Sequence, residues 1–211
     1  MTTPRFTLLI PIKDGREAKT RLDAVGAVGR AELMAAFARD AVTAALRTPL
    51  VRVHVVGDRT ALEPVLAGLD VTVVPDEGAG DLNRALTHAA RAVAEPARGT
   101  AVMLADLPCL RSEDLEAALT AAPFDRRSFV ADAAGTGTTL LVAPPGTALD
   151  PRFGPDSARA HADGGAAAIT ADLASLRLDV DTTADLQRAL QFGVGPHTAA
   201  AAAGLGHLAG S

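Results

Sequence analysis

The feature that most constrains the fold of this chain is a regular alternation between short aliphatic runs and segments of helical periodicity. The aliphatic runs are typical of strands, whereas in the segments between them apolar residues recur about every third or fourth position, as in helices. The expected strands are 6–12, 51–57, 71–75 and 100–105, and the expected helices are 29–46, 61–69, 81–95 with Asp81 as N-cap, and one capped by Ser112. This order predicts a three-layer α/β domain with helices on both faces of a mainly parallel sheet.

The composition agrees with a buried sheet and excludes several classes of protein. Hydrophobic residues make up 48% of the 211 residues but aromatic residues only 3%, so the core must be built from Val, Leu, Ile and Ala, as in parallel sheets covered on both faces. The net charge of −5 argues against a nucleic-acid partner. No apolar run approaches the roughly 20 residues that span a bilayer, and the N-terminus does not resemble a signal peptide. With Cys109 as the single cysteine, no internal disulfide forms, and we expect a cytoplasmic protein without membrane contact.

The pattern changes in the second half of the chain. The runs RSFVAD and TTLLVAP are typical of strands but have no helix between them, which predicts a small antiparallel extension beside the main sheet. A helix around 158–161, a strand at 176–180 and a last helix at 183–190 follow, the last with a capping box of Thr182 and Asp185. We therefore expect a single domain over residues 1–192. The Ala- and Gly-rich tail, 193–211, is expected to be partly disordered.

A group of cations follows the first expected strand: Lys13, Arg16, Lys19 and Arg21. In open α/β sheets ligands bind at the carboxyl ends of the strands, so these side chains are candidates for holding a nucleoside triphosphate and its pyrophosphate leaving group. Neither the dinucleotide-binding pattern nor the P-loop pattern is present. The alternative is an ordinary solvated polar loop.

Three aspartates form the candidate metal site. Asp106 comes directly after a buried strand, and its carboxylate at the ligand edge would suit Mg²⁺ bound to phosphates. Asp179 and Asp181 are two residues apart in the expected strand at 176–180, which would place both on one face. A shared cation would relieve their repulsion. The alternatives are that Asp106 caps a turn and that the pair lies on an exposed edge strand.

Two glycine-containing turns could hold a small anion. Gly135 and Gly137 lie in one, and Gly154 with Ser157 in the other. Glycine permits backbone conformations in which successive N–H groups point at an anion, and the Ser157 hydroxyl adds a donor. Plain connecting turns are the alternative. Cys109 has no paired base and is interpreted as a small buried side chain, and His54, inside a strand, as structural.

The order of these pieces resembles the GT-A-like fold of nucleotide-diphospho-sugar transferases and nucleotidyltransferases. More specifically, it resembles the family of 2-phospho-L-lactate and phosphoenolpyruvate guanylyltransferases, which make the guanylylated precursor of coenzyme F-420. The matching stretches are LIPIKDGREAKTRL, GDLNRAL, DLPCL, RRSFVADAAGTGTTLL, LDPRFGPDSARAH and DVDTTADL, which together span about residues 8–195. The glycine-rich DEGAG tract and a PPG insertion near Gly146 depart from the family pattern, and the tract leaves the base specificity open.

The resemblance implies an enzyme that transfers GMP from GTP to phosphoenolpyruvate or 2-phospho-L-lactate with Mg²⁺ as cofactor, releasing pyrophosphate. It assigns roles residue by residue: metal binding to Asp106, Asp179 and Asp181, GTP binding to Lys13, Lys19, Arg21 and Asn83, acid binding to Thr138, Gly154 and Ser157, and catalysis to Lys19, Arg21 and Asp106. It leaves open a homodimer and the transfer of the product to a downstream transferase. Two alternatives remain at this point: a guanylyl- or cytidylyltransferase for another cofactor such as molybdopterin, and a catalytically silent nucleotide-binding subunit.

Overall fold

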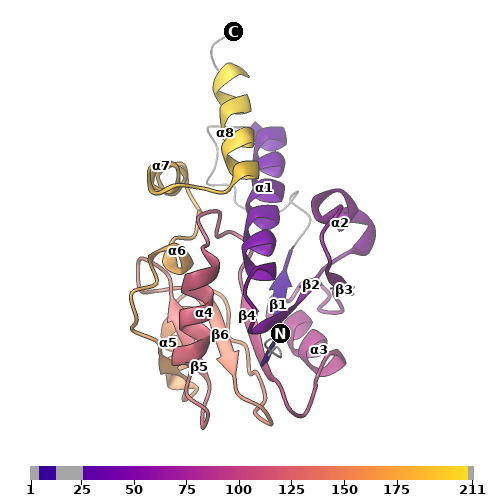
Figure 1. Cartoon of the computed structure of the whole chain (residues 1–211), viewed down its shortest axis with the longest axis vertical. Coiled ribbons are helices and arrows are strands. Elements are labelled where there is room, and N and C mark those ends of the chain that lie inside the picture. The colour runs from indigo at the N-terminus through magenta and orange to yellow at the C-terminus, as the bar shows by residue number, and fades with distance from the viewer. Residues whose placement is uncertain (1–4, 13–25, 209–211) are drawn as a thin grey trace.

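A mixed β-sheet forms the centre of the molecule in the computed structural model, which describes residues 5–12 and 26–208 (Figure 1). Within these residues the sheet has seven strands in the order β3-β2-β1-β4-β6-β5-β7. The strands are β1 Phe6–Pro11, β2 Val51–Val56, β3 Thr72–Val74, β4 Gly99–Met103, β5 Ser128–Ala131, β6 Thr138–Ala143 and β7 Ala167–Ala168. Strands β1 to β4 are parallel, and β6 runs antiparallel to both of its neighbours, β4 and β5. The mainly parallel sheet expected from the alternation of elements is confirmed.

Helices cover both faces of this sheet. The helices of the described residues are α1 Gly26–Leu46, α2 Arg59–Leu66, α3 Leu82–Ala92, α4 Ser112–Ala121, α5 Ser157–Asp163, α6 Ala174–Arg177, α7 Thr183–Phe192 and α8 Pro196–Leu208, of which α7 and α8 pack with α1 in a separate cluster. One core cluster joins a face of the sheet to α1, α2, α4 and α6, and a second joins the other face to α3 and α5. Strand β1 shows why its sequence is continuously apolar: Leu8 and Ile10 enter the first cluster and Leu9 the second, all fully buried.

The expected helix starts are mostly confirmed. The Asp81 carboxylate accepts from the N–H groups of Asn83 and Arg84 at the start of α3, and Thr182 and Asp185 form the capping box of α7. Ser112 is an exception, because it is the first residue of α4 and Arg111 takes the N-cap position. The Ser112 hydroxyl donates instead to the neighbouring Glu113 carboxylate. The serine therefore lies one residue too far into the helix to cap it.

The antiparallel pair expected in the second half exists, but it is part of the main sheet. Strand β6 is hydrogen-bonded directly to β4, with Met103 opposite Leu140. The strand expected at 176–180 is wrong. Residues 174–177 form the short helix α6, and the chain then runs without strand pairing to α7. Leu176 and Val180 are both fully buried but in different core clusters, so their spacing reflects two separate cores rather than one face of a strand.

The C-terminal segment is a helix, and the partial disorder expected there is wrong for residues 196–208. Helix α8 lies alongside α1 (Figure 1). The Asp40 carboxylate of α1 accepts from the N–H groups of His197 and Thr198 in the first turn of α8. None of the helices between residues 26 and 208 combines the length and the apolar character that crossing a bilayer demands.

Candidate active site

The carboxyl ends of β1, β2, β3 and β4 meet at one edge of the sheet, and the strand order reverses between β1 and β4. Such a reversal opens a crevice at which open α/β sheets bind ligands. Strand β6 starts at this same edge, since it is antiparallel to β4 and pairs Leu140 with Met103. The segment 104–106 and the turn between β5 and β6 therefore lie beside each other, and the Leu104 N–H donates to the Thr139 carbonyl at 3.0 Å.

The structure brings Asp106, Asp179 and Asp181 together at this edge. Carboxylate oxygens of the three residues lie within 4.8 Å of one another, although the first aspartate is more than seventy positions from the others. Asp106 and Asp179 are half-buried and Asp181 is exposed. Three carboxylates at this spacing repel one another unless a cation lies between them, and a set of carboxylate oxygens fits a hard divalent cation. The expected grouping is confirmed, although the strand from which it was argued does not form.

Backbone contacts hold the segment that carries Asp179 and Asp181. The Val180 N–H donates to the Asp106 carbonyl at 3.0 Å, which fixes the two acidic segments side by side. One turn earlier, the Arg177 guanidinium donates to the carbonyls of Ala131 and Ile169 at 2.9 and 2.7 Å. Sequence reasoning missed this role of Arg177, because nothing local distinguishes it from a solvated arginine.

The turn of Gly135 and Gly137 does not present its N–H groups to a ligand. The Asp132 carboxylate accepts from the N–H groups of Thr136 and Gly137 at 2.9 and 2.8 Å, and the Asp132 carbonyl accepts from Gly135. Gly135 has a positive φ of 77°. A Cβ at Gly137 would lie 2.5 Å from an Asp132 carboxylate oxygen, which explains the glycine. The anion cradle expected in this turn is therefore wrong, because Asp132 occupies it.

The second turn lies next to the first, since the Ala158 N–H donates to the Thr136 carbonyl at 3.0 Å. Gly154 has a φ of 140°, a conformation that favours glycine, and Ser157 is buried. In the part of the chain that the structure describes, the N–H groups of Gly154 and Asp156 make no hydrogen bond. This turn thus keeps backbone donors that the first turn has used.

Two other candidate residues have their polar atoms engaged by the protein. The amide of Asn83 is bonded to both backbone groups of Phe153, and the Thr138 hydroxyl lies 2.9 Å from His161 Nδ1. The four cations Lys13, Arg16, Lys19 and Arg21 lie outside the described residues. Cys109 is buried, as expected, and burial raises the pKa of its thiol to about 11, so it stays protonated and unreactive. Burial also lowers the pKa of His54 within β2.

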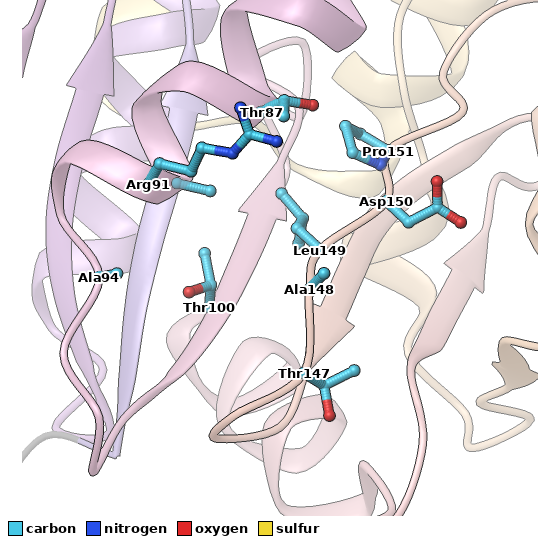
Figure 2. A pocket seen from close by; sticks show the side chains of 10 residues that line it. Thr87, Arg91, Ala94, Thr100, Thr147, Ala148, Leu149, Asp150 and Pro151 are labelled. Carbon is cyan, nitrogen blue, oxygen red and sulfur yellow. The ribbon is translucent and has the colours of Figure 1, made fainter.

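A cavity of about 370 Å³ lies away from this edge. It is lined by the later turns of α3, by Thr100 near the start of β4, and by residues 147–151. Figure 2 shows Arg91 and Thr87 on one side of it and Asp150 and Pro151 on the other. Thr100 is at the opposite end of β4 from Asp106, so this cavity is no part of the acidic site.

The fold and its acidic edge place the protein among nucleotidyltransferase-like α/β proteins. A putative nucleotide-diphospho-sugar transferase from Desulfovibrio desulfuricans has a similar structure, with a TM-score of 0.65 and 19% identity over 89% of this chain and 87% of that one. A nucleotidyl transferase from Methanothermobacter has a TM-score of 0.59 and 17% identity over 89% of this chain and 97% of that one. At these identities the likeness concerns the fold alone.

The sequence is more specific. Residues 6–203 match the family described as guanylyl transferase, CofC-like, and the chain belongs to that family. Among its relatives, the phosphoenolpyruvate guanylyltransferase of Streptomyces avermitilis is 48% identical over 95% of both chains. The protein of the same name from Streptomyces coelicolor is 47% identical over 95% of this chain and 97% of its own.

Proposed function

We propose that this protein is a phosphoenolpyruvate guanylyltransferase of coenzyme F-420 biosynthesis. It transfers GMP from GTP to phosphoenolpyruvate and forms enolpyruvoyl-2-diphospho-5'-guanosine and pyrophosphate. The observation that carries the proposal is near full-length similarity, at 45–48% identity, to several proteins of that name. The acidic cluster at the strand-order reversal supports it, because nucleotidyl transfer needs a metal site next to the bound phosphates.

Asp106, Asp179 and Asp181 would hold the divalent cation, for which we propose Mg²⁺. Small hard cations bound to nucleotide phosphates take carboxylate oxygens from the protein and keep their other positions for phosphate and water. When bound, Mg²⁺ offsets the negative charge that builds on the α-phosphate and on the leaving pyrophosphate. Lys13, Lys19 and Arg21, which follow β1 in the sequence, would bind the triphosphate.

The acid would bind at the turn of Gly154 and Ser157. The N–H groups of Gly154 and Asp156 and the Ser157 hydroxyl are the donors for its anionic groups, with the Thr138 hydroxyl beside them. This assignment is supported by the contrast between the two glycine turns: Asp132 uses the donors of the first, whereas those of the second are available.

The reaction is an in-line displacement at the α-phosphorus of GTP. A phosphate oxygen of the acid forms the new P–O bond, the bond between the α-phosphorus and the bridging oxygen breaks, and pyrophosphate leaves with that electron pair. A phosphate monoester has a second pKa of about 6, so the nucleophile is already dianionic near neutral pH and needs no general base. The protein therefore contributes by positioning the two substrates and by stabilising charge, with Lys19 and Arg21 acting on the pyrophosphate.

A pyrophosphate-release screen tests the proposal. GTP, ATP and CTP are each combined with phosphoenolpyruvate, 2-phospho-L-lactate and phosphoglycerate in the presence of Mg²⁺. We expect turnover with GTP and phosphoenolpyruvate in the cytoplasmic pH range, and a product that a downstream transferase can consume. Turnover with CTP, or the absence of turnover with all three acids, would favour a nucleotidyltransferase of another cofactor's biosynthesis. Binding of GTP without pyrophosphate release under every condition would identify a silent subunit.

A further inference from the structure

The loop before α5 has an unusually constrained backbone. Asp150, Gly154 and Asp156 have φ values of 49°, 140° and 54°, all in the region that L-residues other than glycine rarely adopt. Such conformations persist only where the surroundings hold them, and they occur often at ligand sites. The loop contains the turn proposed for the acid, so the side chains that hold it matter for function.

Asn83 is the first of these side chains. Its Nδ2 donates to the Phe153 carbonyl at 2.9 Å, and its Oδ1 accepts from the Phe153 N–H at 2.7 Å. The orientation of the amide is settled by its partners, because a backbone N–H only donates and a carbonyl only accepts. Asn83 itself is fixed in the first turn of α3, where its N–H donates to the Asp81 cap. The amide thus ties the residue next to Gly154 to a helix seventy positions away in the sequence.

His161 is the second. Its Nε2 accepts from the Arg152 N–H at 2.9 Å, and its Nδ1 lies 2.9 Å from the Thr138 hydroxyl. The ring is buried against Phe153, with 5.2 Å between centroids in an edge-on arrangement. Since Nε2 accepts, Nδ1 carries the proton of the neutral ring and donates it to the Thr138 oxygen. The Thr138 hydroxyl, which accepts from His161, can then donate its own hydrogen to another acceptor.

We propose that Asn83 and His161 are positioning residues for the acid, which hold the Gly154 turn at three consecutive peptide units and orient the Thr138 hydroxyl. The inference rests on the proposed function and deepens it. His161 connects all three residues assigned to the acid: Thr138 by its Nδ1, the Gly154 turn by Arg152, and Ser157 by the helix they share. The Asn83 amide already uses one N–H and one lone pair on the Phe153 backbone, so the bonds that the structure shows serve the loop.

Steady-state kinetics with GTP and phosphoenolpyruvate varied in turn test the inference. Asn83→Asp keeps the acceptor for the Phe153 N–H but sets a carboxylate oxygen against the Phe153 carbonyl. His161→Gln keeps an acceptor for Arg152 but loses the donor to Thr138, and His161→Leu loses both. We expect Asn83→Asp and His161→Leu to raise KM for phosphoenolpyruvate about 10- to 100-fold, as displaced binding groups do, with KM for GTP within twofold. His161→Gln should be milder.

Thr87→Val is the matched control, because Thr87 lies one turn further along α3 and its hydroxyl donates to the Asn83 carbonyl within the helix. It should leave both KM values within twofold. A larger rise in KM for GTP than for the acid in Asn83→Asp would return Asn83 to the nucleotide site and overturn the inference. So would lowered thermal midpoints with unchanged KM values, which indicate a purely structural role. If His161→Leu does not fold, Asn83→Asp and His161→Gln decide. Lack of turnover in the wild type, by contrast, contradicts the proposed function itself.

Discussion

Asp106 is the member of the proposed metal site that follows β4 at the strand-order reversal, and its carboxylate lies within 4.8 Å of both others. Asp106→Asn removes one anionic ligand while keeping its size. We expect turnover to fall by at least about 100-fold, as for loss of one major electrostatic contributor, with the thermal midpoint little changed. Pyrophosphate release at increasing Mg²⁺ measures this.

The control for this change is Asp125→Asn, since Asp125 is exposed and its carboxylate accepts from the neighbouring Arg126 guanidinium. Turnover of Asp106→Asn near the wild-type level, at the same Mg²⁺ concentration, would show that Asp106 is not a metal ligand.

His161 makes the stability of the fold depend on pH. Burial, with a further contribution from the Arg152 guanidinium, lowers the pKa of His161 from 6.5 to about 4. Below pH 6.5 the unfolded chain binds a proton that the folded protein does not, so this contribution to stability is complete above pH 6.5 and is lost as the pH falls towards 4. We expect wild type to lose about 2–3 kcal/mol more than His161→Gln between pH 7 and 4.5 in urea unfolding.

His88→Gln is the matched histidine control, because the His88 side chain lies partly exposed on α3, whereas the His161 ring is buried. It should follow the wild-type pH dependence. Equal losses in wild type and His161→Gln would show that His161 is protonated in the folded state.

At the scale of elements, α8 is held by one buried carboxylate at its first turn and by apolar packing against α1. Asp40 accepts from two N–H groups in the first turn of α8 and lies 2.9 Å from His197 Nδ1. Its carboxylate at the N-terminal end of α8 also interacts favourably with the positive end of the helix dipole. A Cβ at Gly195 would lie 2.3 Å from the Asp40 carboxylate carbon. Gly195→Ala should therefore destabilise the protein by about 1–3 kcal/mol in urea unfolding, as overpacking does.

Gly204→Ala provides the comparison within the same helix. A Cβ there meets nothing within 4 Å, so the substitution should be neutral or stabilise by up to about 1 kcal/mol through helix propensity. If both alanine variants had the same unfolding free energy as wild type, the contact between Asp40 and α8 would not constrain the fold.

At the scale of the whole molecule, the residues proposed for the two substrates follow different parts of the sheet. Those proposed for GTP come directly after β1 in the sequence, whereas the turn before α5 lies beyond β4 and β6. We expect Lys19→Ala to raise KM for GTP and Ser157→Ala to raise KM for the acid, the latter by about 10- to 100-fold for a lost hydrogen bond to a charged group. In the double variant, the losses of transition-state stabilisation calculated from kcat/KM of the two single variants should add, as for independent sites.

Kinetics of the two single variants and the double variant, with each substrate varied in turn, measure this. If Ser157→Ala raised only KM for GTP, the two sites would be assigned the wrong way round. Strong non-additivity would indicate one shared site instead of two.

Elements whose hydrogen bonds and burial are local could be predicted from the sequence. The aliphatic runs of β1, β2 and β4, the Asp81 cap and the capping box of Thr182 and Asp185 could be predicted, because each depends on neighbours within a few positions. The family motifs also identify Asp106 and the pair Asp179 and Asp181 as candidate metal ligands, since each motif is a short contiguous stretch of the chain.

Only the tertiary structure decided which of these residues meet, and what else holds them. The carboxylates of Asp106, Asp179 and Asp181 come together because the Val180 N–H donates to the Asp106 carbonyl, not because of the strand that the spacing of Asp179 and Asp181 suggested. Helix α8 is ordered by Asp40, 157 positions away from His197, so its Ala-rich composition gave no sign of it. The anchoring of the acid loop by Asn83 and His161 is equally invisible in the sequence. Periodicity encodes which face of an element is buried, but the partner on that face is chosen by packing across the whole chain.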